Sequence, residues 1–206
     1  MMKRSWILGA VLLAAAVAVP ATARARMVDL HLGANAGGMY GWGTTTNTPD
    51  FFHQAAGPGF GFEAGLKLLI FDVSVNFMQI IKNGGLDGTL IQLLAGIDTD
   101  LPAGSQKLPN GQSVNVVHIG AWAGGALGTG APVSFPITND QLADKGFVSR
   151  FRGAYEYYLN EFMGVGGEVS FGYHYFLGGE ATINSADHSS GYHLIGLVDF
   201  TFHLGF

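Results

Sequence analysis

The sequence has 206 residues, of which 32 are Gly, 15 are Phe and none is Cys. Ten basic and fifteen acidic residues give a formal net charge of −5, so the chain lacks the basic face that a nucleic-acid-binding protein needs. The absence of Cys excludes a disulfide scaffold, a thiolate metal site and a lipoprotein acylated on an N-terminal Cys. Because 48% of the residues are apolar, a chain of this length can form a folded single domain.

The first 25 residues have the layout of a secretory signal peptide. Two positive charges in residues 1–4 precede the uncharged apolar run Trp6–Val19, which Pro20 ends. Two overlapping small-x-small cleavage sites follow within residues 21–25. The apolar run is shorter than the ~20 residues of a bilayer-spanning helix. We therefore expect a signal peptide over residues 1–25 and one domain over residues 26–206.

The rest of the chain alternates apolar and polar residues with a period of two, which is typical of β-strands. The clearest segment is Tyr192–Phe206, which is longer than an ordinary strand but suits a tilted strand that crosses a bilayer. Eight strands are predicted in all: Val28–Gly41, Phe60–Leu68, Phe71–Phe77, Leu90–Asp98, Val114–Leu127, Phe147–Tyr157, Met163–Tyr175 and Tyr192–Phe206.

The predicted connections alternate in length, as they do in bacterial outer-membrane barrels. Two are short turns, near residues 69–70 and 159–161, and four are longer: Trp42–Gly59, Lys82–Thr89, Gly128–Gly146 and Leu177–Gly191. The link Thr99–Ser113 is long on the side expected to carry short turns, and we expect it to extend the hairpin of its two strands. The loop residues Trp42, Phe51 and Phe52 are expected to expose aromatic rings that either rest at the level of the lipid head groups, which is favoured, or bind a partner.

One face of the predicted sheet is polar and the other is apolar. Alternate positions along each strand form two sets, and we call the set that carries the charged residues the polar parity. It is opposite to the set that carries the aromatic residues. All ten charged residues in the strands belong to it: Asp29, Glu63, Lys67, Asp72, Asp98, Arg150, Arg152, Glu156, Glu168 and Asp199. The polar parity is rich in Gly, which suits the crowded interior of an eight-stranded barrel. The pattern predicts an all-β fold, an eight-stranded antiparallel transmembrane up-and-down β-barrel. A soluble lipocalin-like barrel, with its apolar face inside, is the alternative that periodicity leaves open.

The last strand resembles the C-terminal signature of bacterial outer-membrane barrels. Its alternating residues end on a terminal Phe: Val198, Phe200, Phe202, Leu204 and Phe206. In that family this strand is recognised by the barrel-assembly machinery. The size, strand number and loop asymmetry make the chain similar to the small barrels of the outer-membrane protein A, X and W type. The resemblance implies a monomer in the cell outer membrane, surrounded by lipid and lipopolysaccharide.

Five charged residues share one level at the middle of the predicted barrel: Glu63, Arg150, Arg152, Glu168 and Asp199. They are expected to pair, because an uncompensated charge in a narrow, dry lumen is very unfavourable. Such a network is either a salt-bridged plug that fills the barrel or a gate whose pairs exchange to admit ions. The plug is favoured because eight strands leave an interior only wide enough for side chains.

Histidines on the polar parity form two pairs on neighbouring predicted strands, His31 with His203 and His174 with His193. Two imidazoles can share a metal ion, but no third ligand at a suitable spacing is evident. The pairs are therefore interpreted as hydrated side chains at the rims. No metal and no cofactor are expected.

Enzymatic barrels of this size act on lipid A, as deacylases or acyltransferases, and need a nucleophile beside a base. The candidates are the run His188-Ser189-Ser190 and the pair Ser170 and His174. Neither forms a recognisable catalytic constellation. The predicted function is an outer-membrane barrel with a structural or a small-solute or ion-pore role, and a lipid-A-modifying enzyme is the alternative.

Overall fold

The computed structural model describes residues 27–45, 56–82, 85–129, 144–177 and 188–205. The predicted signal peptide, the loop residues Phe51 and Phe52, and the terminal Phe206 lie outside the described residues. Within the described part of the chain, no helix is long and apolar enough to cross a membrane.

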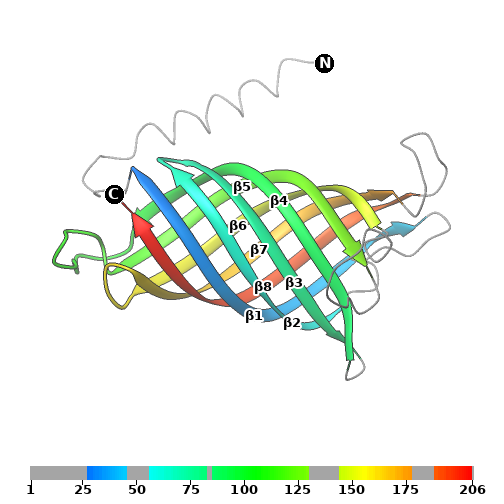
Figure 1. Ribbon diagram of the computed structural model, residues 1–206, viewed down its shortest axis with the longest axis horizontal. Coiled ribbons are helices and arrows are strands. Elements are labelled where there is room, and N and C mark those ends of the chain that lie inside the picture. The colour runs from blue at the N-terminus through cyan, green and yellow to red at the C-terminus, as the bar shows by residue number, and fades with distance from the viewer. Residues whose placement is uncertain (1–26, 46–55, 83–84, 130–143, 178–187, 206) are drawn as a thin grey trace, which may run out of the picture.

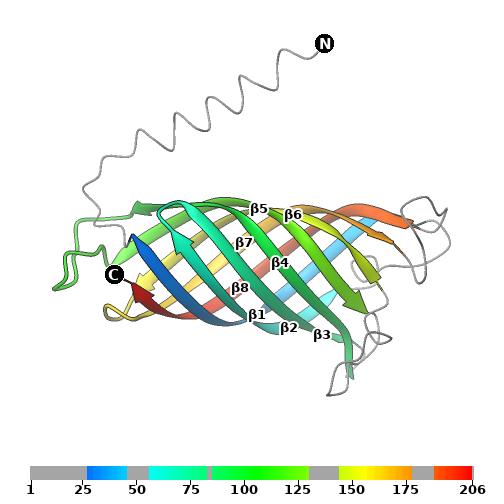
Figure 2. The ribbon, with the colours of Figure 1, turned by 45° about the horizontal axis from the view of Figure 1, so that its top comes forward.

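Eight antiparallel strands form one closed barrel (Figures 1 and 2). The strands are β1 (Val28–Thr45), β2 (Gly57–Leu68), β3 (Phe71–Lys82), β4 (Gly85–Pro102), β5 (Asn115–Thr129), β6 (Asp144–Tyr158), β7 (Met163–Leu177) and β8 (His188–Gly205). Each strand pairs with the next one in sequence, and β1 closes the barrel on β8 from Asp29↔Gly205 to Thr45↔Ser189. The predicted eight-stranded up-and-down barrel is confirmed.

The observed strands extend beyond the predicted ones, mostly at the end remote from the chain termini. β1 continues through Trp42, so this residue lies in a strand and not in a loop. The expected long connection Lys82–Thr89 is wrong, because Lys82 pairs directly with Gly85. The sequence Asn83-Gly84 between these strands is a strong hairpin signal that the alternation pattern did not take into account.

One end of the barrel carries the turns of β2–β3 and β6–β7 and the β4–β5 link, and we call it the short-turn end. The C-terminal end of β8 lies at this end too (Figures 1 and 2). The β4–β5 link extends the hairpin as predicted, since the Ala103 amide donates to the Asn115 carbonyl at 2.8 Å and Lys107 bridges to Ser113. The opposite end is called the long-loop end.

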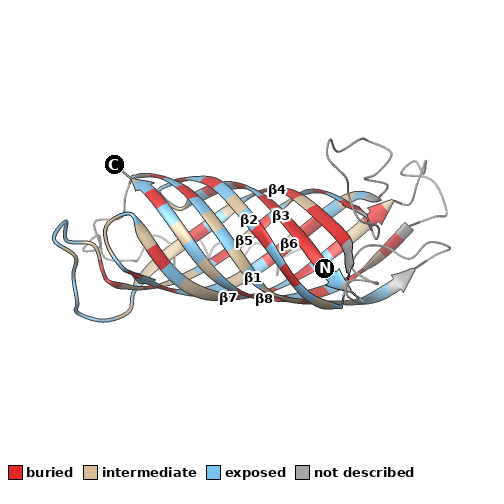
Figure 3. Ribbon diagram, turned by 60° about the horizontal axis from the view of Figure 1, so that its bottom comes forward, coloured by how far each residue is buried: buried red, intermediate tan, exposed pale blue. Residues whose placement is uncertain are grey.

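Buried and exposed residues alternate along the strands (Figure 3), as expected when successive side chains point to the lumen and to the exterior. The charged residues of the polar parity point inward, so that Asp72 and Asp98 are each only 2% exposed. Large apolar side chains cover the outside, where Phe62 is 58% exposed and Phe151 and Val198 are each 64% exposed. A lipocalin-like barrel has the opposite arrangement, so this alternative is wrong.

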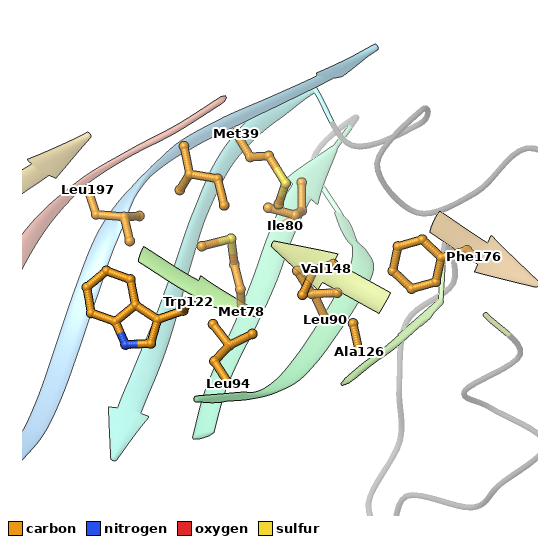
Figure 4. Packing of buried hydrophobic residues seen from close by; sticks show 11 residues of the cluster. Met39, Met78, Ile80, Leu90, Leu94, Trp122, Ala126, Val148, Phe176 and Leu197 are labelled. Carbon is orange, nitrogen blue, oxygen red and sulfur yellow. The ribbon is translucent and has the colours of Figure 1, made fainter. Parts of the chain in front are cut away.

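The lumen is divided into two halves of different chemistry. Towards the long-loop end lies the apolar half, formed by eleven buried residues (Figure 4): Met39, Met78, Ile80, Leu90, Leu94, Trp122, Ala126, Val148, Phe176, Ile195 and Leu197. These residues come from seven of the eight strands, and β2 contributes the buried glycines Gly59 and Gly61 at this level. The expectation that a charged network fills the whole lumen is therefore corrected, because charges fill only the half towards the short-turn end.

Candidate functional site

The charged half of the lumen surrounds a cavity of about 80 Å³, which is enough space for several water molecules. All eight strands contribute ionisable residues to its lining: Asp29, His31, Glu63, Lys67, Asp72, Asp98, Asp100, His118, Arg152, Glu156, Glu168, Asp199 and His203. These thirteen residues, with Arg150 above them, define the charged half.

Two arginines on β6 hold the predicted mid-barrel charges together. Arg152 Nη1 lies 3.3 Å from Glu168 Oε2 and 3.6 Å from Glu63 Oε1. Arg150 approaches the same two carboxylates at 3.9 and 3.8 Å. The structure thus brings together four of the five residues proposed from the sequence. Asp199 lines the same cavity, but no ion pair found among the described residues includes it.

Trp122 separates the charged half from the apolar half. The guanidinium carbons of Arg152 and Arg150 lie 4.6 and 5.5 Å from the centre of its ring, which is the geometry of cation–π contacts. The indole occupies the space of two missing side chains, because a Cβ on Gly120 would lie 2.2 Å from Trp122 Cη2 and one on Gly96 would lie 2.8 Å from Cγ. Glycine at both positions therefore lets the ring lie against the wall.

A chain of alternating carboxylates and imidazoles runs around the short-turn end of the lumen. His203 contacts Asp29 through Nδ1 at 2.8 Å and Glu156 through Nε2 at 3.0 Å. His118 contacts Glu156 through Nε2 at 3.1 Å and Asp100 through Nδ1 at 2.9 Å. Because an imidazolium donates from both ring nitrogens, this arrangement suits the charged form of both histidines.

Glu156 connects strands that are not neighbours. It stands on β6, and its Oε1 reaches across β7 to His203 on β8. The β7 residue beneath it is Gly164, where an added Cβ would lie 2.1 Å from Glu156 Oε1. The missing side chain at Gly164 makes this contact possible.

One group of residues has the composition of a metal site. Asp98, Asp100 and His118 each offer one ligand atom, and these atoms lie within 4.8 Å of one another. The Lys67 ammonium stands beside them, 2.8 Å from Asp98 Oδ2 and in contact with Asp100 Oδ1. Asp72 Oδ1 is buried and has no hydrogen-bond partner among the described residues.

The sequence interpretation missed Asp100 and His118 as site residues. The predicted link Thr99–Ser113 includes Asp100, whereas β4 continues to Pro102. His118 lies in a segment that is apolar on both faces, so its orientation was not evident. The signal was present, since Asp98 and Asp100 share one parity and the observed register pairs Asp100 with His118.

The other predicted pairs lie in the lumen without forming a recognisable site. The expectation that the two histidine pairs are hydrated at the rims is wrong, because each of the four residues is at most 9% exposed. The His31 and His203 rings are 6.5 Å apart in the charged half, and the His174 and His193 rings are 5.7 Å apart, fully buried near the long-loop end. Ser170 and His174 are four residues apart on one strand, about 13 Å at the strand rise, so they cannot form a nucleophile–base pair. The side chain of His188 lies outside the described residues, and Ser189 is 2% exposed.

Similarity to known proteins is found in the fold only. No protein-family model matches the chain, and no curated protein is significantly similar to it in sequence. The crystal structure of Neisserial surface protein A matches with a TM-score of 0.51 and 11% identity, over 86% of this chain and 97% of that one. The outer membrane protein OprG from Pseudomonas aeruginosa gives a TM-score of 0.40 and 8% identity, over 87% and 95%. The chain therefore has the fold of the small eight-stranded bacterial outer-membrane barrels.

Proposed function

We propose that this protein is an integral barrel of the bacterial outer membrane with a structural role and a lumen closed to solutes. It is exported with the signal peptide of residues 1–25 and inserts with its short-turn end in the periplasm. The last strand, with Val198, Phe200, Phe202 and Leu204, serves as the signal for the barrel-assembly machinery. Lipid and lipopolysaccharide surround the monomer.

The exterior supports the location in a membrane. Large apolar side chains are exposed on all sides of the barrel, including Phe71, Phe151 and Val169, which are 60% exposed or more. Soluble monomers rarely expose continuous apolar patches of more than a few hundred Å². Closure of β1 on β8 also pairs the backbone groups of the barrel, which hydrocarbon could not satisfy.

The apolar half supports the closed lumen, and it is the observation that carries the proposal. Its eleven residues are each at most 9% exposed, and they come from seven strands around the lumen. Leu94 and Val148 are completely buried. The polar side chains that lie among them, such as Gln92, His174 and His193, are each at most 3% exposed, so this level is packed and an ion would have to lose its water to pass it.

Two measurements test the proposal. Fractionated membranes should contain the protein in the outer membrane, and its band should shift on a gel after boiling, as a closed barrel does. The purified barrel in a planar lipid bilayer should then give no steady ionic current. A soluble periplasmic band without a shift would contradict the membrane location. A steady current would instead support a small-solute or ion-pore role.

A further inference from the structure

We propose that Asp98, Asp100 and His118 form a binding site for one divalent transition-metal ion at the periplasmic mouth of the lumen. The site lies in the charged half, beside the 80 Å³ cavity that all three residues line. It does not depend on whether the barrel conducts.

Strand register places the three ligands together. Asp98 and Asp100 are two residues apart on β4 and point to the same side, and Asp100 pairs with His118 on β5. His118 Nδ1 lies 2.9 Å from Asp100 Oδ1 and 3.5 Å from Asp98 Oδ2. Zinc binds nitrogen and oxygen at about 2.0–2.2 Å, so a group within 4.8 Å has to contract by only about 1 Å around the ion.

Glu156 prepares His118 as a ligand. Its Oε2 lies 3.1 Å from His118 Nε2, the nitrogen that faces away from the two aspartates. In metal sites, a carboxylate on the second ring nitrogen of a ligating histidine fixes the orientation of the ring and raises its basicity. Metal binding would then take the lone pair of Nδ1 and release the proton that this nitrogen carries in the metal-free protein.

The charge of the cavity favours a cation. Eight carboxylates line it: Asp29, Glu63, Asp72, Asp98, Asp100, Glu156, Glu168 and Asp199. The positive groups that line it or contact these carboxylates, among the described residues, are Lys67, Arg150, Arg152, His31, His118 and His203. The carboxylates at the cavity therefore outnumber the basic groups by eight to six.

Asp72 is a second, independent indication of a missing cation. Its side chain lines the same cavity and the residue is only 2% exposed, yet its Oδ1 has no hydrogen-bond partner among the described residues. Asp98 Oδ1 is in the same situation. A buried carboxylate oxygen without a donor is very unfavourable unless a cation or water satisfies it.

Lys67 holds the place of the ion in the metal-free protein. Its ammonium bridges Asp98 and Asp100, so a metal ion must displace it. Asp72 is the direct cross-strand neighbour of Lys67 in the β2–β3 pair. The displaced ammonium therefore has a carboxylate to move to, and no bare charge is left behind.

The position of the ligands gives the ion access from the mouth of the lumen, and the ligand atoms determine which metal ions fit. The Asp100 side chain is 34% exposed at the mouth, whereas that of Asp98 is 3% exposed further inside. An imidazole with two carboxylates suits zinc, manganese or iron, whereas calcium prefers six to eight oxygen ligands. We therefore expect Zn²⁺ to bind and Ca²⁺ not to compete with it.

The test is a Zn²⁺ titration of the untagged barrel, extracted from membranes in detergent and stripped with a chelator. Calorimetry should show one equivalent of Zn²⁺ bound to the wild type. Asp98→Asn and His118→Gln each remove a ligand, and Glu156→Gln should weaken binding by about 10–100-fold. Lys67→Gln should tighten binding, because it removes the competing ammonium. Boiling-dependent band shifts establish that each variant is folded.

Asp199→Asn is the matched control, because it removes one carboxylate from the same cavity without removing a ligand and should weaken binding far less than Asp98→Asn does. Co²⁺ should give an absorption spectrum that changes in His118→Gln, which reports nitrogen ligation directly. The proposal is overturned if the wild type binds no Zn²⁺, if Ca²⁺ displaces Zn²⁺ at equal concentration, or if folded Asp98→Asn and His118→Gln bind as tightly as the wild type.

Discussion

The two halves of the lumen are both filled by side chains, but the side chains are of opposite chemistry. The apolar half fills the space with side chains such as Leu94 and Val148, which are completely buried and need no partner. The charged half fills the same cross-section with acids and bases and still leaves a cavity of about 80 Å³. Apolar packing closes the barrel, whereas ionic packing keeps space and charge at its mouth.

The difference lies in how each half tolerates the loss of one member. Removal of an apolar side chain leaves a void whose unfavourable free energy grows with its volume. Removal of one charge leaves its partners buried and uncompensated, which is more unfavourable than the pair itself was favourable. Arg152 is the extreme case, since it approaches Glu63, Asp98 and Glu168 at once.

Arg152→Ala should therefore have the largest effect. We expect the free energy of unfolding to fall by about 3–5 kcal/mol, because three carboxylates lose their common cation. Urea unfolding in detergent, followed by the boiling-dependent band shift, measures it. Arg152→Lys keeps the charge and should lose less. Equal losses for the two variants would show that packing, and not charge, makes Arg152 important.

Leu94→Ala tests the apolar half. Leu94 is 0% exposed, so we expect a loss of about 3 kcal/mol in the same unfolding assay. The control is Leu93→Ala on the same strand, because Leu93 is 59% exposed on the outside, where lipid can fill the vacated space. If Leu93→Ala destabilised the barrel as much as Leu94→Ala, the assignment of inside and outside would be contradicted.

Much of the fold could be predicted from the sequence because strand alternation has a strict period of two. All ten charges of the predicted strands face the lumen, and the last strand has the predicted parity, with Val198 outside and Asp199 inside. Strand ends were harder to predict. Leu90–Asp98 and Val114–Leu127 are apolar on both faces, since they border the apolar half, and no change in the alternation marks where Asp100 joins β4.

The details of the site depend on contacts that cross strands, and these are not encoded in local periodicity. Glu156 reaches His203 across β7 only because residue 164 is glycine. The Asp100–His118 pair depends on the register of β4 and β5. Counting residues from the strand ends predicts that Asp199 lies at the level of the paired charges. The guanidinium groups of Arg150 and Arg152 instead approach Glu63 and Glu168.

A double-mutant cycle at the boundary measures how strongly the two halves are coupled. Trp122 belongs to the apolar half, and Arg152 stacks on it at 4.6 Å. We expect Trp122→Leu and Arg152→Ala to show a coupling free energy of about 1 kcal/mol, the size of a partly desolvated cation–π contact. A coupling of zero would mean that the halves are stabilised independently.

The smallest effect is expected outside both halves, in the β4–β5 link. Lys107 Nζ donates to Ser113 Oγ at 2.7 Å, in a polar contact that resembles those of the charged half. Lys107 is exposed, however, so water can replace the lost partner. Lys107→Ala should change the free energy of unfolding by less than about 0.5 kcal/mol. A loss as large as that of Arg152→Ala would mean that burial is not what makes the charged half sensitive.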